Sequence, residues 1–135
     1  QLESLHTRWP VEQELPELPR LRRLEGSGKL GPQPELREIV SYGPLVFPAS
    51  LPQVERISWS PKVDDVGPEL VKLAGYPRLR ELSLHNWHPK RVIVPDAFGE
   101  LAQLERLRVS HSRWATPQAR ARLRELLPDC RVEFR

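Results

Sequence analysis

The segment LRELSL at residues 79–84 returns 25 residues later as LERLRV at residues 104–109. The same arrangement of apolar residues, L-x-x-L-x-L, occurs 25 residues upstream in VERISW at residues 54–59, and a reduced copy at the end of the chain keeps Val132 and Phe134. Each copy follows a stretch of helical character and cannot bury its own apolar positions. Several copies must therefore stack to form one continuous core, which predicts a solenoid of parallel strands.

Two weaker copies precede these repeats. LRRLEG at residues 21–26 and LREIVS at residues 36–41 keep the first two apolar positions, but the third falls to Gly26 and Ser41, and the spacings shorten to 15 and 18 residues. We expect both segments to continue the sheet, joined by non-helical arcs, which makes about six strands in all. Trp59 follows these two small residues in the same inward column, and we expect its indole to fill the space beside them.

In these motifs the chain resembles the leucine-rich repeat family, whose units of about 20–29 residues share the core L-x-x-L-x-L. The match covers about residues 54–135, and only Asn86 meets the asparagine of the family's turn, so the chain resembles an atypical, short member. The resemblance implies an α/β fold, namely a right-handed leucine-rich repeat solenoid. It places a parallel β-sheet on the concave face, and short helices with extended proline-rich arcs on the convex face. It also implies that the concave face binds proteins.

The 135 residues are enough for one domain. We divide this single leucine-rich repeat domain (1–135) into an N-terminal cap at residues 1–20, short irregular repeats at 21–53, regular 25-residue repeats at 54–128 and a closing strand at 129–135. A short helix is expected in the cap from Pro10 to Leu15, with the proline in its first turn. The Gly- and Pro-rich composition of residues 26–53 predicts extended connections.

Three helices are expected on the convex side. Asp65 can cap the first, through residues 68–74, and Gly75 would end it in the left-handed conformation. The second is expected at residues 95–102. The third begins at Thr116, whose hydroxyl precedes a proline in the first helical position, the strongest such signal in the chain.

The composition indicates the cellular compartment of the protein. No apolar run approaches the roughly 20 residues that span a membrane, so no membrane association is expected. The single cysteine, Cys130, excludes an internal disulfide framework and favours a reducing compartment, so we expect a cytoplasmic protein. Because the chain begins with Gln1 rather than methionine, removal of an N-terminal segment is an open alternative. Cys130 is interpreted as a partly buried spacer rather than a catalytic thiol.

The charge is unevenly distributed. Residues 1–67 hold 8 basic and 10 acidic groups, a balance of −2, whereas residues 68–135 hold 13 basic and 8 acidic groups, a balance of +5. A partner with an acidic surface is therefore expected at the C-terminal end. Together with Arg113, the arginines of the last predicted helix could instead meet nucleic acid phosphates, namely Arg120, Arg122 and Arg124. The 18 acidic residues and the lack of aromatic residues among the basic ones disfavour that alternative.

Charged residues alternate in sign along the predicted sheet. The first outward position of successive copies reads Arg23, Glu38, Arg56, Glu81, Arg106 and Arg131, so cross-strand ion pairs are expected until the last step. One interpretation is a self-neutralising face in contact with solvent, where each pair contributes about 0–1 kcal/mol. The other is a rigid lattice that selects a protein partner by complementary charge. Both stay open at this stage.

Aromatic and basic residues follow two neighbouring strands. His85, Trp87 and His88 come after one strand, and His111, Arg113 and Trp114 come after the next, so adjacent loops should bring them to one rim. Exposed tryptophans beside arginine and histidine have the composition of an interface hot spot. The alternative is that the tryptophans fold inward as core. A zinc site is not expected, because a His-x-x-His spacing without a cysteine or acidic ligand is a weak signal.

We therefore predict a non-enzymatic protein–protein interaction module, serving as an inhibitor, an immunity-type partner or an assembly subunit. The alternatives are a nucleic-acid-binding module that uses the arginine-rich C-terminal end, and a structural domain of a longer polypeptide. No catalytic residue, cofactor, metal or small-molecule substrate is expected. The predicted partner-binding residues are Arg56, Glu81, Ser83, His85, Trp87, His88, Arg106, Arg108, His111, Arg113 and Trp114.

Overall fold

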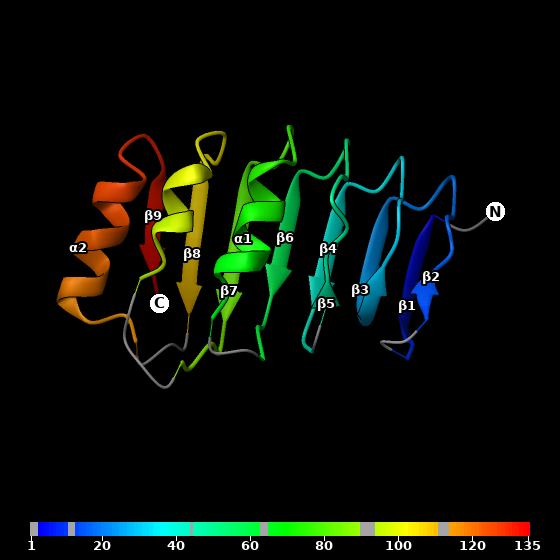
Figure 1. Cartoon of the computed structure of the whole chain (residues 1–135), viewed down its shortest axis with the longest axis horizontal. Helices are drawn as coiled ribbons and strands as arrows, with labels where there is room; N and C mark the ends of the chain where they lie inside the picture. Colours follow the sequence, from blue (N-terminus) through cyan, green and yellow to red (C-terminus); the bar gives the residue numbers. More distant parts are fainter. Residues whose placement is uncertain (1–2, 11–12, 44, 63–64, 90–93, 111–113) are drawn as a thin grey trace.

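The structure is a computed structural model that describes residues 3–10, 13–43, 45–62, 65–89, 94–110 and 114–135. Strands make up most of its regular structure, and the helices belong to the C-terminal half (Figure 1). In chain order the elements are β1 (Ser4–Arg8), β2 (Glu14–Leu15), β3 (Arg23–Leu30), β4 (Glu38–Ser41), β5 (Leu45–Val46), β6 (Arg56–Trp59), α1 (Gly67–Ala74), β7 (Glu81–His85), the 3-10 helix η1 (Asp96–Glu100), β8 (Arg106–Ser110), α2 (Pro117–Leu126) and β9 (Arg131–Phe134).

Nine strands form one sheet in which all described pairs are parallel. Seven of them lie side by side in the order β1-β3-β4-β6-β7-β8-β9, while β2 and β5 pair with the carboxyl end of β3 (Figure 1). From β6 onward, equivalent positions of the 25-residue copies stand opposite each other, so that Glu81 lies between Arg56 and Arg106. The predicted parallel pairing and its register are confirmed.

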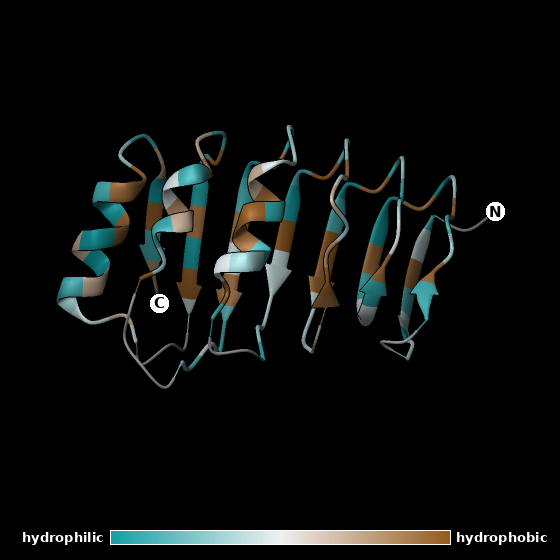
Figure 2. Cartoon of the chain, in the orientation of Figure 1, coloured by the Kyte–Doolittle hydropathy of each residue, from teal (hydrophilic) through white to brown (hydrophobic). Residues whose placement is uncertain are grey.

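The apolar positions of the repeated motif form the core. The six that define the two clearest copies are all buried: Leu79, Leu82, Leu84, Leu104, Leu107 and Val109. Exposure alternates along β7 and most of β8, because successive strand side chains point to opposite faces of the sheet. Figure 2 shows the result as alternating hydrophilic and hydrophobic bands along the strands. The prediction of a common core is confirmed, and Glu81 and Arg106, expected to be exposed side by side, lie opposite each other and are half-exposed.

The helices lie on one face of the sheet, where η1 contacts both α1 and α2. The predicted start of α2 is confirmed, because the Thr116 hydroxyl accepts a hydrogen bond from the Ala119 amide at 3.2 Å. The N-cap of α1 is Val66 rather than the predicted Asp65, whose carboxylate accepts a hydrogen bond from the Gly67 amide at 2.9 Å. The segment expected as the second helix forms only η1. The prediction for Gly75 is wrong, since its φ of −83° lies in the right-handed region.

The first 20 residues contribute strands rather than a cap helix. β1 pairs in parallel with β3, and so does the short β2. The helix predicted from Pro10 to Leu15 is wrong, because Glu14 and Leu15 are extended; Val11 and Glu12 lie outside the described residues. Proline explains part of this result, since Leu15 precedes Pro16 and a residue in that position is pushed out of the helical region. The main row of the sheet therefore has seven strands rather than about six.

Two tryptophans fill the space around the small inward residues. Trp59 is buried opposite Ser41 and packs edge-on against Phe47, with ring centroids 5.2 Å apart. The space beside Gly26 is taken by Trp9 instead, because a Cβ there would lie 3.0 Å from the Trp9 ring. The expectation that Trp59 fills both places is therefore correct only for Ser41.

Candidate functional site

The candidate site is the face of the sheet that carries no helix among the described residues (Figure 1). Alternate strand side chains point to this open face. They form a first column of Ser4, Arg23, Glu38, Arg56, Glu81, Arg106 and Arg131, and a second of His6, Glu25, Val40, Ser58, Ser83, Arg108 and Glu133. Five predicted binding residues are thereby brought together on β6–β8, namely Arg56, Glu81, Ser83, Arg106 and Arg108.

Ion pairs link neighbouring strands along the first column. Glu38 binds both Arg23, with Nε and Oε1 2.8 Å apart, and Arg56, with Nε and Oε2 3.6 Å apart. The hydrogen bond to Glu38 raises the pKa of the Arg23 guanidinium. Farther along, Arg106 lies 3.8 Å from Glu81. The alternation of charge read from the sequence is thus realised as contacts between strands.

Glu133 changes the electrostatics of the C-terminal end. Its carboxylate accepts a hydrogen bond from Arg108 at 3.0 Å and lies 2.9 Å from the Nε of Arg131. Desolvation alone would raise the pKa of this carboxyl, but the hydrogen bond from Arg108 and the charge of Arg131 hold it below its usual value. The sequence alone predicts unpaired positive charge at this end. In the structure, Arg108 and Arg131 instead share the Glu133 carboxylate.

A hydrogen-bonded trio lies next to this lattice. His85, at the end of β7, contacts Ser110 through Nδ1 and Ser58 through Nε2, the latter at 2.9 Å. A serine beside an imidazole nitrogen is the geometry that activates a nucleophile. The second imidazole nitrogen, Nε2, meets another hydroxyl, that of Ser58. The trio therefore orients a half-buried histidine on the open face.

The two rim tryptophans belong to the core. Trp87 and Trp114 are buried, with ring centroids 4.8 Å apart in an edge-on arrangement. Their prediction as exposed hot-spot residues is therefore wrong, and the alternative that they fold inward is correct. The physical reason is area, because each indole can bury more apolar surface against the other than a solvent-exposed rim would allow. His88 is exposed next to them.

Two of the predicted rim residues stay predictions. His111 and Arg113 lie outside the described residues. Within the described ranges, no three His, Cys, Asp or Glu side chains are close enough together to hold a metal ion.

The arginines of α2 are engaged with their own chain. Arg122 binds Asp96 at 2.9 Å and Glu125 at 3.2 Å. Arg120 and Arg124 lie over the ring of Phe134, at 4.7 Å and 5.2 Å from its centroid. Guanidinium groups held in this way cover the end of the core by cation–π contact. This use competes with the phosphate contacts that a nucleic-acid interface would need.

Cys130 is predicted to react slowly with thiol reagents. Desolvation by burial raises the pKa of its thiol, so less thiolate is present at neutral pH than in a free cysteine. The rate of labelling by a disulfide reagent at pH 7.5 should be several-fold below that of the same chain unfolded in urea, which serves as the matched control. Equal rates in the two states would contradict the burial of Cys130.

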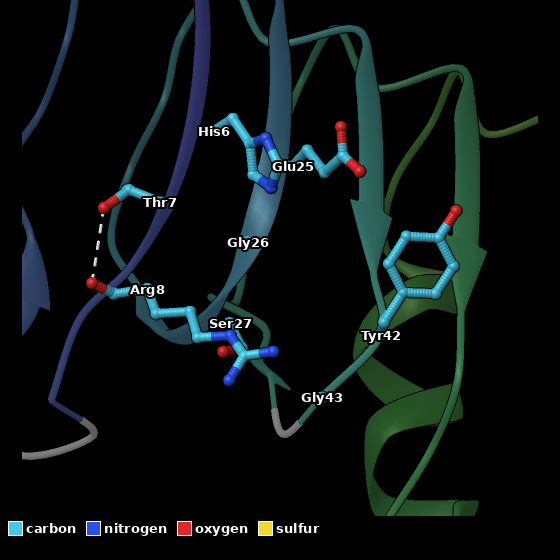
Figure 3. Close-up of a pocket in the computed structure, with 8 residues that line it drawn as sticks. All are labelled: His6, Thr7, Arg8, Glu25, Gly26, Ser27, Tyr42 and Gly43. Carbon is cyan, nitrogen blue, oxygen red and sulfur yellow. Dashed lines mark hydrogen bonds between the residues drawn. The ribbon is translucent and has the colours of Figure 1, made fainter.

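A hollow opens in the open face near its N-terminal end (Figure 3). It has a volume of about 290 Å³ and lies where the carboxyl end of β1 and the middle of β3 meet the end of β4. Its lining is His6, Thr7, Arg8, Glu25, Gly26, Ser27, Tyr42 and Gly43. None of these residues is a site residue predicted from the sequence, because residues 1–20 were predicted to form a cap and not a strand beside β3.

No protein-family model matches the chain, and no curated protein is significantly similar to it in sequence. In the described part of the chain, no helix has both the length and the apolar character needed to cross a bilayer.

Proposed function

We propose that this protein is a non-enzymatic binding module of the leucine-rich repeat type, with the described sheet as the concave face of a right-handed solenoid. The partner is another protein, and the module acts on it as an inhibitor, an immunity-type partner or an assembly subunit. The observation that carries the proposal is the open face, where seven parallel strands present ordered columns of charged side chains without a covering helix in the described residues.

The arrangement of charge favours recognition of a folded surface. Each guanidinium of the lattice is held by a carboxylate on its own or a neighbouring strand, as Arg23 and Arg56 are by Glu38. Side chains ordered before binding lose less conformational entropy when a partner docks. Arginine is also enriched at protein interfaces, because its planar group makes several directed hydrogen bonds. A pre-ordered lattice of this kind therefore selects partners by the position of charges.

The partner is expected to be acidic where it meets the lattice. The most exposed guanidinium side chains of its ion pairs belong to Arg56 and Arg131, at 58% and 70% of their full accessible area. These groups retain donors that their own carboxylate partners do not cover, since one guanidinium carries five N–H groups. Carboxylates on the partner would complete these hydrogen bonds.

Affinity capture with the purified protein tests the proposal. Proteins retained by the wild type should bind Arg56→Gln and Arg108→Gln at least about tenfold more weakly, because each change removes a charged donor from the open face. Lys29→Gln is the matched control, since it removes an exposed cation near the end of β3, away from the β6–β8 lattice. Far-UV circular dichroism would check that each variant is folded. Equal binding by all four proteins would exclude the lattice as the binding surface.

The salt dependence of the same complex distinguishes a protein partner from a nucleic-acid partner. Binding to phosphates weakens steeply with salt because counterions are released, and nuclease treatment would abolish it. Capture that survives nuclease and loses less than about tenfold in affinity between 50 and 200 mM salt would favour a protein partner.

A further inference from the structure

We propose that the hollow lined by Arg8, Ser27 and Tyr42 binds an acidic side chain within an extended segment of the partner protein. This inference deepens the proposed function and rests on it, because it names the chemistry of one contact made by the open face. The C-terminal lattice and this hollow lie at opposite ends of the sheet, so they can be tested separately.

Small residues between larger ones create the hollow. Ser27 on β3 stands opposite Arg8 on β1, and Gly43 follows β4 next to them. Tyr42 rises beside these two small residues, as Figure 3 shows, with 61% of its area exposed. It is the most exposed large apolar residue of the described chain. A hollow with Tyr42 on one side, Arg8 on the other and the small residues Ser27 and Gly43 between them can hold one or two side chains.

Glycine makes the floor possible. A Cβ at Gly26 would lie 2.0 Å from the Thr7 carbonyl oxygen, so only glycine allows β1 to approach β3 this closely. Gly28 has a φ of +134°, a conformation that other residues rarely adopt, and a Cβ there would lie 2.6 Å from Trp9 Nε1. The Trp9 indole donates a hydrogen bond to the Lys29 carbonyl at 2.7 Å. The hollow is therefore built on a packed layer rather than on a loose strand.

The charges in the hollow suit a carboxylate. Among the described residues, the Arg8 guanidinium makes no ion pair and the Ser27 hydroxyl makes no hydrogen bond, in contrast to the paired arginines elsewhere on the face. Glu25 also lines the hollow, but Arg23 lies 3.4 Å from its carboxylate and offsets its negative charge. A guanidinium with all its donors available binds a carboxylate in bidentate fashion, and a nearby hydroxyl can add a third bond.

The shape favours an extended segment over a folded domain. A volume of about 290 Å³ admits a side chain or two, whereas the rest of the partner would have to lie along the open face. Tyr42 offers its ring to the residue next to the acidic one, and tyrosine contributes large contact area at low entropic cost. The occupant is therefore an Asp or Glu with an apolar neighbour.

Selection from a random dodecapeptide library on the immobilised full chain tests this inference. Enriched peptides should share an Asp or Glu beside an apolar residue, and replacing that acid with its amide should weaken binding at least about tenfold, the range for a hydrogen bond to a charged group. Arg8→Gln should weaken binding of the acidic peptide by a similar factor, and Tyr42→Ala by at least about fivefold. Lys29→Gln is the matched control and should bind normally.

A charge exchange makes the test independent of folding. Arg8→Glu should reject the acidic peptide and accept the version whose acid is replaced by lysine, which a merely unfolded variant would not do. Enriched peptides without an acidic preference, no enrichment at all, or Arg8→Gln binding equal to wild type would each overturn the inference. If captured partner proteins depend on Arg56 and Arg108 while Arg8→Gln changes nothing, the binding function stands and only the assignment of the hollow fails.

Discussion

Trp87→Ala is expected to lower the free energy of unfolding by about 3–5 kcal/mol, the range for truncating a buried large aromatic residue. Trp87 is 1% exposed and packs edge-on against Trp114, so the change would leave a cavity and remove an aromatic pair at once. Small domains have only about 5–15 kcal/mol of stability in total. The variant should therefore unfold at a much lower urea concentration, measured by far-UV circular dichroism.

His88→Ala is the matched control for this prediction. His88 is the next residue in the chain and is exposed, so its truncation should change stability by no more than about 0.5 kcal/mol. A loss below about 1 kcal/mol for Trp87→Ala would contradict the burial of the indole pair. Such a result would restore the interpretation of Trp87 as an exposed binding residue, and its effect on partner affinity should then be measured directly.

Leu107→Ala should destabilise the protein by about 2–5 kcal/mol. Leu107 is fully buried in β8, between Leu82 of β7 and Val132 of β9, so its side chain joins three successive copies of the motif. Each repeat of a stacked structure is stabilised mainly by its neighbours. The loss should therefore appear in both flanking strands, as faster amide hydrogen exchange in β7 and β9.

The control for Leu107→Ala comes from the neighbouring strand β7. Ser83→Ala on β7 points to the open face, and its effect should stay within about 0.5 kcal/mol. If Leu107→Ala unfolded at the same urea concentration as wild type, the continuous core would not exist as described. Hydrogen exchange that changed in β8 alone would argue against coupling between neighbouring repeats.

The open face that we propose as the binding surface has two ends with different chemistry. At the C-terminal end, arginines and glutamates are already paired with each other, as Arg108 is with Glu133. At the N-terminal end, Arg8 has no such partner among the described residues and sits beside the exposed Tyr42. A partner that spans the open face would contact the charge lattice at the C-terminal end and the hollow at the N-terminal end. The variants proposed above measure these two contributions separately.

The pairing of Glu133 with Arg108 could have been predicted from the sequence. The same register that paired Glu81 with Arg106 places Glu133 opposite Arg108 in the second outward column. The first column by itself places Arg131 opposite Arg106, and this is why unpaired charge is predicted there. The first strand was also within reach, because Leu2, Leu5 and Thr7 repeat the apolar spacing with threonine in the third position.

The periodic apolar residues by themselves determined the parallel sheet, its register and the buried rows, because a repeat of fixed length can bury its apolar side only by stacking in step. They also determined where the outward charges meet, since a strand alternates its side chains strictly. Only the tertiary structure determined where the side chains of Trp9, Trp87 and Trp114 pack. Whether an indole next to a strand is core or surface depends on the space left by distant small residues and on a second aromatic ring, and neither is encoded in the local pattern. The hollow beside Tyr42 arose in the same way, from the close approach of β1 to glycines in β3.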